Sequence, residues 1–358
     1  MKIIGVMSGT SLDGVDLVAV EFFHENDKIA FRLLASETVS YDLKWKKILQ
    51  EAVLLSGEKL CSLDQAYGHF LGSLVSQFLH KYSLHADLVS SHGHTIFHQP
   101  QNGFTTQIGN GSAICSETGI TVVNDFRTLD VALGGQGAPL VPIGDQLLFN
   151  DYTYCLNLGG IANISYNNAV GHRIAFDICP VNMMLNRLAE EKQLAFDKDG
   201  ELAANGNVNQ ELLSTLNQLD YYQHSPPKSL GYEWFLQNFL PKVSSFSISV
   251  EDKLSTVCHH VAQQVSLALQ MQQPNQSILV TGGGAKNKFL VALLNRYCSI
   301  KVAIPETQLI DFKEAIVFAL LGYLRLQNIP NVLCSVTGAK RDSVSGVLHG
   351  NFSSFTER

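Results

Sequence analysis

The sequence has no two cysteines in a C-x-x-C spacing, no excess of basic residues and no long hydrophobic run. Its seven cysteines are scattered and odd in number, which argues against a disulfide framework or a cysteine zinc site. We therefore expect free, buried thiols in a reducing compartment. The formal net charge of −7, from 25 basic and 32 acidic residues, argues against nucleic acid or an anionic membrane as the main partner. A nucleotide, which is bound locally, remains possible.

Apolar segments of membrane-spanning length are also missing. The longest apolar stretch, residues 315–324, is about half as long as a membrane span. The apolar run at residues 3–7 is shorter than the core of a secretory signal. We expect a cytoplasmic protein.

The composition indicates a folded α/β protein. With 358 residues the chain is long enough for two domains of about 150 residues each. Hydrophobic residues make up 46% and charged residues 16%, which excludes a disordered chain. Apolar strands are expected at residues 2–8, 15–22, 86–90, 154–158, 161–165, 174–176 and 277–281, and helices at 42–56, 64–82, 182–193, 208–219, 287–297 and 313–327. Because strands alternate with helices, the class is α/β.

A first glycine-bearing turn follows the first expected strand. Its backbone N–H groups and two hydroxyls can cradle phosphate oxygens. The candidate cofactor-binding residues are Gly9, Thr10, Ser11, Leu12, Asp13, Gly14, Val15 and Asp16. Asp13 and Asp16 are candidate Mg²⁺ ligands, acting through water, because Mg²⁺ prefers hard oxygen donors. The alternative is a plain β-hairpin turn.

Two further glycine turns follow apolar strands. The second places Gly159 and Gly160 between two strands, with Asn163 beyond them, and its alternative is a tight hairpin. The third, Gly282, Gly283 and Gly284, opens a helix, where backbone N–H groups attract anions. No G-K-[ST] follows it, so it is not a Walker A loop, and a dinucleotide-binding G-x-G-x-x-G is missing. The glycine-rich region 103–145 also favours a site.

Two strand–turn–strand phosphate loops followed by a late GGG loop resemble the actin and hexokinase superfamily. More specifically, the chain resembles the anhydro-N-acetylmuramic acid kinase family. The motifs that carry this resemblance are Met7-Ser-Gly-Thr-Ser-Leu-Asp-Gly-Val-Asp16, Ser91-His-Gly-His-Thr95, Asn124-Asp-Phe-Arg127, Gly134-Gly-Gln-Gly-Ala-Pro-Leu-Val-Pro142, Asn157-Leu-Gly-Gly-Ile-Ala-Asn163, Val280-Thr-Gly-Gly-Gly284 and Lys313-Glu314.

The resemblance implies two actin/hexokinase-like (ribonuclease H-like) domains with ATP and Mg²⁺ in a cleft between them, and typically a homodimer. The expected borders are residues 1–125 plus 325–358 for the first domain and 126–324 for the second. The implied reaction opens the anhydro bridge of 1,6-anhydro-N-acetylmuramic acid with water and transfers the γ-phosphoryl group of ATP to the released 6-oxygen. The product is N-acetylmuramic acid 6-phosphate, made during cell-wall recycling.

The resemblance also implies roles for single residues. Asp177 matches the family's general base, which accepts a proton from the attacking water, although taken alone it reads as a helix cap or turn residue. Glu314 matches a segment near the cleft and is a second catalytic candidate, with a charge in the first turn of a helix as the alternative. The predicted substrate-binding residues are His92, Arg127, Asp130 and Asn182. Arg127 suits the lactyl carboxylate, and the alternative for it is a structural ion pair.

The chain departs from the family after Asp177. The family reads Phe-Asp-Thr-Gly-Pro-Gly-Asn here, whereas this chain has Ile178, Cys179 and Val181 in place of Thr and the two Gly, and Asn186 where an acidic residue is frequent. Neither Cys nor Val adopts a positive φ as readily as Gly, so the loop takes another path or the glycines were not needed for that purpose.

Three other interpretations remain. A zinc site of His92, His94 and His98 would need all three on one face of a strand, although Gly93 and Pro100 suggest that the strand ends there. The altered loop is compatible with a kinase for another anhydro-sugar such as levoglucosan, although Arg127 favours a sugar with a carboxylate. The third interpretation is a non-catalytic nucleotide-binding scaffold.

Overall fold

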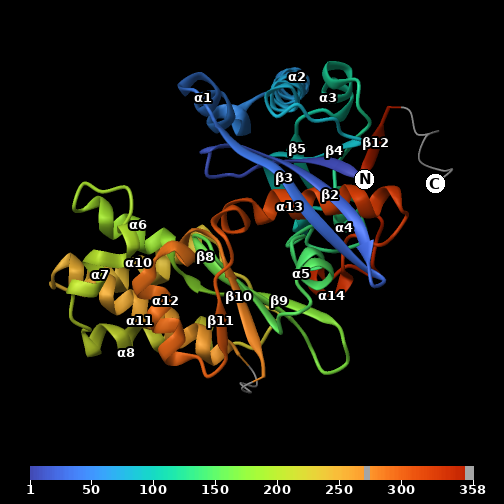
Figure 1. Ribbon diagram of the computed structural model, residues 1–358. Coiled ribbons are helices and arrows are strands. Elements are labelled where there is room, and N and C mark those ends of the chain that lie inside the picture. Colours follow the sequence, from blue (N-terminus) through green and yellow to red (C-terminus); the bar gives the residue numbers. More distant parts are fainter. Residues whose placement is uncertain (270–274, 351–358) are drawn as a thin grey trace. The chain divides into compact units, whose positions relative to one another are not determined.

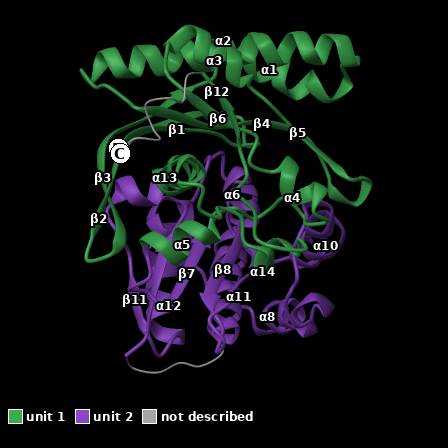
Figure 2. Cartoon of the chain, turned by 90° about the vertical axis from the view of Figure 1, so that its right-hand side faces the viewer, with its two compact units in different colours: residues 1–148, 312–358 green, residues 149–311 purple. Residues whose placement is uncertain are grey.

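A computed structural model describes residues 1–269 and 275–350 of the chain (Figure 1). It divides into two compact units (Figure 2). Unit 1 consists of residues 1–148 and 312–358, and unit 2 of residues 149–311. Each unit is built around its own sheet, and unit 1 is discontinuous in sequence.

The sheet of unit 1 has seven strands in the order β12-β6-β4-β1-β2-β3, with β5 paired to β4. Its strands are β1 (Lys2–Ser8), β2 (Gly14–Glu25), β3 (Lys28–Ser40), β4 (Leu88–Gln99), β5 (Phe104–Ile108), β6 (Val122–Asn124) and β12 (Val347–His349). Strands β1, β2 and β3 form an antiparallel meander, while β1, β4 and β6 run parallel. The carboxyl ends of these three parallel strands therefore meet at one edge of the sheet.

Helices lie on both faces of this sheet, with α1, α2 and α3 on one side and α13 on the other (Figure 2). The helices of unit 1 are α1 (Leu43–Glu51), η1 (Ala52–Leu54), α2 (Gly57–Lys81), η2 (Pro100–Asn102), α3 (Gly111–Thr118), α4 (Thr128–Ala132), α5 (Pro142–Leu148), α13 (Thr307–Leu326, in unit 1 from Phe312 on) and α14 (Cys334–Thr337). Tyr67, Leu71 and Val75 of α2 are buried at spacings of four residues and pack with Val6 and Leu17 of the sheet.

The sheet of unit 2 has five strands in the order β11-β10-β7-β8-β9. They are β7 (Tyr154–Leu158), β8 (Ile161–Asn167), β9 (Arg173–Pro180), β10 (Ser277–Thr281) and β11 (Lys301–Ala303). Strands β7, β8 and β9 form an antiparallel meander, and β7, β10 and β11 run parallel. Unit 2 thus repeats the strand order of unit 1: a meander of three strands, with its first strand continued by parallel strands.

Eleven helical segments of the described part of the chain lie wholly in unit 2. They are α6 (Asn182–Glu190), η3 (Lys198–Gly200), α7 (Glu201–Asn205), α8 (Gln210–Asn217), η4 (Asp220–Gln223), α9 (Tyr232–Trp234), η5 (Phe235–Phe239), α10 (Leu240–Ser244), α11 (Val250–Ala268), η6 (Gly283–Lys286) and α12 (Lys288–Tyr297). The core joins both layers: Val257 and Val261 of α11 and Leu290 of α12 are buried with Leu156 and Val280 of the sheet.

The predicted α/β class with two similar domains is confirmed by these sheets. The predicted domain borders, at 125/126 and 324/325, differ from the observed unit borders at 148/149 and 311/312. The reason lies in packing, because Arg127, Asp130 and Asp145 all contact side chains or backbone of unit 1. The cleft for ATP between the domains stays a prediction.

Most predicted elements are confirmed, but two had wrong bounds, and β3 was not predicted. The strand expected at 86–90 runs on through the histidine segment to Gln99, and the last long helix starts at Thr307 rather than 313. Glu314 therefore lies inside α13 and is not a first-turn charge.

The prediction of free, buried thiols is confirmed in part. All seven cysteines are free, but only Cys155, Cys179, Cys258 and Cys298 are buried, and Cys61 is exposed. Among the helices of residues 1–269 and 275–350, none combines the length and the hydrophobicity that crossing a bilayer requires.

Candidate functional site

The first glycine turn connects β1 to β2 at the carboxyl end of β1. Gly9, Thr10, Ser11, Leu12 and Asp13 form the turn itself, and Gly14, Val15 and Asp16 are the first residues of β2. Leu12 has a φ of 60°, and its N–H donates to the carbonyl of Gly9 over 3.4 Å. Val15 is fully buried in the unit 1 core, so only its backbone is available to a ligand.

Asp16 lies on the opposite face of β2 from Val15 and Leu17, which pack towards α2. Its Oδ1 accepts a hydrogen bond from Thr38 Oγ1 over 2.6 Å. On this face it is close enough to Glu314 for its charge to raise the pKa of that carboxyl. The structure thus brings two predicted site carboxylates together within unit 1.

Glu314 projects from the third turn of α13 and keeps contact with solvent. Desolvation by the surrounding protein atoms raises its pKa, while the charges of Arg127 and Lys313 lower it. Four residues later in α13, the centroid of the Phe318 ring lies 4.6 Å from the centroid of the His92 ring. One face of α13 therefore gathers Asp16, Glu314, Arg127 and His92.

Arg127 and His92 form a hydrogen-bonded pair in this cluster. Arg127 Nε donates to His92 Nε2 over 2.9 Å, and His92 Nδ1 lies 2.9 Å from the carbonyl of Gly93. Because a guanidinium only donates, Nε2 must be the acceptor and Nδ1 must carry the proton. Burial and the charge of Arg127 lower the pKa of His92 well below its ordinary value, so the ring stays neutral. Arg127 Nη1 donates to the carbonyl of Gly137 over 2.7 Å, which fixes the guanidinium.

Asp130 does not face this cluster as a free ligand. It is completely buried, and its Oδ2 accepts from the N–H of Gly137 over 2.7 Å while its Oδ1 accepts from Thr337 Oγ1 over 2.7 Å. We predicted a substrate contact for Asp130, but both oxygens are taken by protein donors. Asp130 and Arg127 thus bond to the N–H and the carbonyl of the same residue, Gly137, and the substrate contact of Asp130 stays a prediction. No ion pair between Asp130 and Arg127 is found in the described residues.

The three histidines of the zinc interpretation point in different directions. Between Val6 and Ser8 of β1 the pairing with β4 shifts from Ser91 to His94, so β4 carries a bulge, and Gly93 has a φ of 73°. His92 consequently faces α13, whereas His94 lies 3.0 Å from Ser8 Oγ on the side of α2. His98 Nδ1 is 3.2 Å from Thr105 Oγ1. In the described residues no group of three or more His, Cys, Asp or Glu is arranged to hold a metal.

In unit 2 the second and third glycine turns lie next to each other. Gly159 and Gly160 follow β7, and Gly282 follows the parallel neighbour β10. A side chain at Gly282, where φ is 79°, would collide with Asn157 and Leu158. Gly283 and Gly284 lie beside Asn182. The two turns therefore form one glycine-lined edge of the sheet, where ligands of open α/β sheets usually bind.

Helix α6 begins at this edge. The N–H of Asn182 donates to the carbonyl of Gly159 over 3.2 Å, and its Nδ2 donates to the carbonyl of Leu158 over 2.9 Å. The Asn182 amide, predicted to bind substrate, is thus engaged in tying α6 to the second glycine turn. Asn163, predicted to bind cofactor, lies in β8 directly opposite Asp177 of β9.

Asp177 is held by a segment distant in sequence. Its Oδ2 accepts from the N–H of Leu230 over 2.8 Å, its own N–H donates to the carbonyl of Lys228, and the hydroxyl of Tyr221 donates to its carbonyl. Burial raises the pKa of Asp177, and the bond from Leu230 partly lowers it. Oδ1 has no partner among the described residues, so one oxygen is fixed and the other can accept a proton. Sequence reasoning missed Leu230, Lys228 and Tyr221, because contacts over 44 to 53 residues leave no local pattern.

The substitutions after Asp177 are accommodated in the core. Ile178, Cys179 and Val181 are 3%, 0% and 0% exposed and pack in the unit 2 core. None of the three has a positive φ. Between Ala162 and Asn163 of β8 the pairing partner changes from Cys179 to Asp177, so β9 carries a bulge at Ile178. The altered residues therefore fill the interior, and they leave Asp177 on the strand.

Two lysines beside the third glycine turn are paired with carboxylates. Lys286 Nζ lies 2.5 Å from Asp311 Oδ1, and Lys288 Nζ lies 3.0 Å from Asp199 Oδ2. Lys313, next to Glu314, forms a buried ion pair of 2.6 Å with Asp145. Both lysines beside the third glycine turn therefore already have carboxylate partners.

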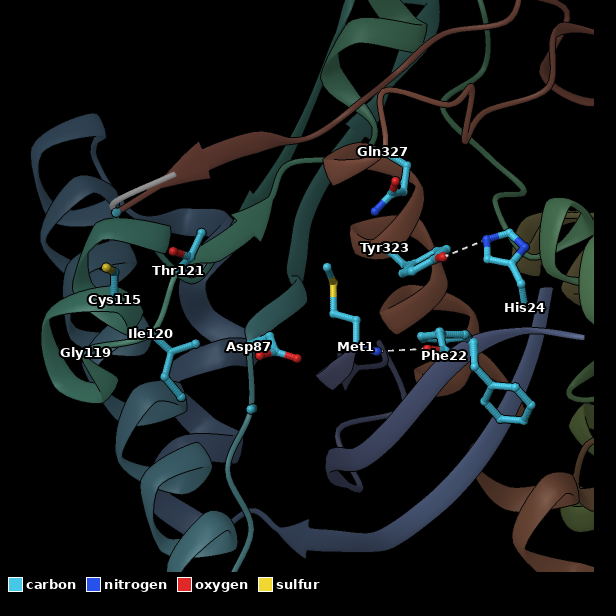
Figure 3. A pocket seen from close by; sticks show the side chains of 13 residues that line it. Met1, Phe22, His24, Asp87, Cys115, Gly119, Ile120, Thr121, Tyr323 and Gln327 are labelled. Carbon is cyan, nitrogen blue, oxygen red and sulfur yellow. Dashed lines mark hydrogen bonds between the residues drawn. The ribbon is translucent and has the colours of Figure 1, made fainter. Parts of the chain in front are cut away.

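A depression of about 670 Å³ lies at the other end of the unit 1 sheet (Figure 3). Met1, Asp87 and Thr121 line it and immediately precede β1, β4 and β6, so it is at the amino ends of the parallel strands. Tyr323 of α13 donates to or accepts from His24 over 3.2 Å at its rim. None of the predicted site residues lines it.

Comparisons with known proteins cover almost the whole chain. The model of the anhydro-N-acetylmuramic acid kinase family matches residues 1–351. A relative of that name from Vibrio vulnificus (strain CMCP6) is 37% identical over 365 residues, covering 97% of both chains. One from Crocosphaera subtropica is 34% identical over 380 residues, covering 98% of this chain and 99% of its own length.

Among solved structures, the activator of the 2-hydroxyisocaproyl-CoA dehydratase from Clostridium difficile aligns with a TM-score of 0.45 at 15% identity, over 92% of this chain and 97% of that one. This similarity is too low to support an argument. The family match and the relatives confirm what the sequence motifs indicated: the chain belongs to the anhydro-N-acetylmuramic acid kinase family.

Proposed function

We propose that the chain is an ATP-dependent kinase that opens 1,6-anhydro-N-acetylmuramic acid and phosphorylates it to N-acetylmuramic acid 6-phosphate, a step of cell-wall recycling. Membership of the family and the names of the relatives support this substrate. The observation that carries the mechanism is the Asp177 carboxylate, which has one oxygen held by Leu230 and burial that raises its pKa.

Asp177 acts in this proposal as the general base. The water oxygen forms a bond to the anomeric carbon, the bond between that carbon and the 6-oxygen breaks, and the water proton passes to Asp177 Oδ1. The 6-oxygen takes the γ-phosphoryl group, and ADP leaves. A raised pKa makes the carboxylate a better proton acceptor, and the bond from Leu230 keeps it oriented.

Arg127 binds the lactyl carboxylate of the sugar. A guanidinium suits a planar carboxylate, and Arg127 is already oriented by His92 and by the carbonyl of Gly137. Glu314, beside it on α13, orients water or relays a proton.

The glycine turns bind ATP. Residues 9–14 offer backbone N–H groups to phosphate oxygens, and Gly282 to Gly284 allow the nucleotide close approach. Asp13 and Asp16 would hold Mg²⁺. The charge of Asp16 raises the pKa of Glu314, and a cation bound beside these carboxylates would relieve the repulsion between them. When bound, Mg²⁺ offsets charge on the transferred phosphoryl group and keeps several waters.

The alternative sugar substrate loses its main motivation. It arose from the altered residues 178–181, and Ile178, Cys179 and Val181 are buried in the core. Cytoplasmic location and a homodimer remain predictions.

The test measures ADP release with Mg-ATP and 1,6-anhydro-N-acetylmuramic acid in ¹⁸O-labelled water, with the product analysed by mass spectrometry. Label in the anomeric hydroxyl together with a 6-phosphate is expected. Asp177→Asn should be inactive, and Asp220→Asn, which changes a carboxylate 89% exposed in the same unit, should match the parent.

Other outcomes are equally decisive. Turnover of levoglucosan alone would contradict the proposed substrate. No turnover with any anhydro-sugar would favour the non-catalytic scaffold. Equal turnover in Asp177→Asn and the parent would remove Asp177 from the mechanism.

A further inference from the structure

A buried ring of three hydroxyls lies directly behind the first glycine turn. Ser8, the last residue of β1, has its Oγ 2.7 Å from Tyr41 Oη, and Tyr41 Oη is 2.5 Å from Tyr67 Oη. The Tyr67 hydroxyl donates to Ser8 Oγ over 2.9 Å, which closes the ring. His94 Nδ1 lies 3.0 Å from the same Ser8 Oγ. The four side chains are between 0% and 5% exposed.

The protons of this network can be placed by counting donors. Each hydroxyl has one proton to donate. Because Tyr67 donates to Ser8, the contact between the two tyrosines needs the proton of Tyr41. The contact between Ser8 and Tyr41 then needs the proton of Ser8. Ser8 has none left for His94, so His94 must donate, and its proton is on Nδ1.

The charge state of the four groups agrees with this count. Burial raises the pKa of Tyr41 and of Tyr67 and lowers the pKa of His94 to about 4. All four groups are neutral near pH 7, and every contact has one proton. A satisfied buried network of this kind holds its members in one arrangement.

The network reaches the first glycine turn from four directions. Ser8 precedes Gly9 in the chain, Tyr67 comes from α2, and His94 comes from β4. Tyr41 follows β3, and its backbone N–H also donates to the carbonyl of Asp13 within the turn over 3.4 Å. The strands and the helix next to the turn are therefore hydrogen-bonded to each other through these side chains.

We propose that Ser8, Tyr41, Tyr67 and His94 form a positioning network that holds the first glycine turn in the conformation that receives the ATP phosphates. The proposal rests on the proposed function, and the four residues do not touch the reacting atoms. It assigns to His94 the neutral form with the proton on Nδ1.

The first experiment separates positioning from general stability. Tyr41→Phe and Tyr67→Phe each remove one hydroxyl, and Tyr82→Phe is the control, since Tyr82 ends α2 and is 38% exposed. We expect the KM for ATP to rise about tenfold in the first two variants, in line with the loss of a buried hydrogen bond. The KM for the sugar should stay within about twofold. Unchanged ATP values, or equal increases for both substrates, would overturn the proposal.

A second pair of variants tests the donor at position 94. His94→Asn places an amide N–H close to the position of Nδ1 and should keep the KM for ATP near the parent value. His94→Leu removes the donor and should behave like Tyr67→Phe. If Asn and Leu have the same effect, His94 does not act through this hydrogen bond.

The third measurement needs no variant in the network. Two-bond ¹H–¹⁵N spectra of the protein labelled at histidine report which ring nitrogen carries the proton, and the His94 signals are those missing from His94→Asn. A proton on Nδ1 is expected, and a proton on Nε2 would refute the assignment.

The failure of this inference is distinguishable from failure of the proposed function. If the parent turns over no sugar, calorimetry with a non-hydrolysable ATP analogue replaces KM. Weaker binding to Tyr67→Phe would then still support the network, and equal binding would refute it.

Discussion

Replacing Thr337 by valine should destabilise unit 1, because it removes the hydroxyl that donates to the buried carboxylate of Asp130. Thr337 is 2% exposed, and its Oγ1 donates to Asp130 Oδ1 over 2.7 Å, while Asp130 is 0% exposed. Valine has nearly the shape of threonine but has no donor, so Asp130 Oδ1 would be buried without a partner. Leaving such a group unsatisfied costs about 2–3 kcal/mol, a large part of the roughly 5–15 kcal/mol by which domains are stable.

Urea unfolding of Thr337→Val at neutral pH measures this loss. If the two units unfold separately, the transition of unit 1 should move and that of unit 2 should not. Thr337→Ser keeps the hydroxyl and should lose less stability. In an Asp130→Ala background the change at Thr337 should have little further effect, because the partner is gone.

The same change should also alter substrate binding. Asp130 Oδ2 holds the N–H of Gly137, whose carbonyl accepts from Arg127. A looser Asp130 should therefore raise the KM for the carboxylate-bearing sugar more than that for ATP. A stability change below about 0.5 kcal/mol, or the same loss with and without Asp130, would refute the reasoning.

Three further predictions concern unit 2. Val181→Gly, which restores the family residue, should destabilise the protein by about 2–4 kcal/mol in urea unfolding, because it empties a fully buried position and adds backbone freedom; an increase in stability would contradict the packing seen here. Burial raises the pKa of Asp177, so its ionisation opposes folding as the pH rises through that raised pKa. Asp177→Asn should therefore have a Tm at pH 7 equal to or above that of the parent, and a lower Tm would contradict the raised pKa. The kcat/KM of the parent should fall in acid with a midpoint above 3.8, the ordinary pKa of Asp. Burial lowers the pKa of His260 to about 3, so the unfolded chain binds this proton first, and the free energy of unfolding should decrease as the pH falls from 6.5 towards 3. In His260→Asn the slope of the unfolding free energy against pH should correspond to about one proton fewer taken up on unfolding. An unchanged slope would show that His260 does not cause the pH dependence.

Local sequence patterns were sufficient to predict much of the fold. Apolar runs that end in glycine predicted β1, β7 and β10 and the three turns after them, since a turn depends on residues adjacent in the chain. Apolar positions near a period of 3.6 predicted α1 and α2. Strand β3 was missed although it forms the edge of the unit 1 sheet, because its residues are mostly half-buried and lack a clear apolar run.

The sequence motifs pointed to residues that the structure brings together within unit 1, but not to what each residue does. The motifs named Arg127, His92, Glu314 and Asp16, and these four gather on one face of α13 in unit 1. Whether they bind substrate and cofactor stays a prediction.

By itself the sequence determined the α/β class, the positions of the glycine turns and the family, because these depend on neighbouring residues or on whole motifs. Only the tertiary structure decided that Asp130 is bonded to Thr337 and Gly137, and that His92 and His94 face opposite sides of the sheet. It also decided that Cys179 and Val181 fill the core. These outcomes depend on a strand bulge and on contacts between distant segments, where packing and hydrogen bonding select one orientation among those that the local chain allows.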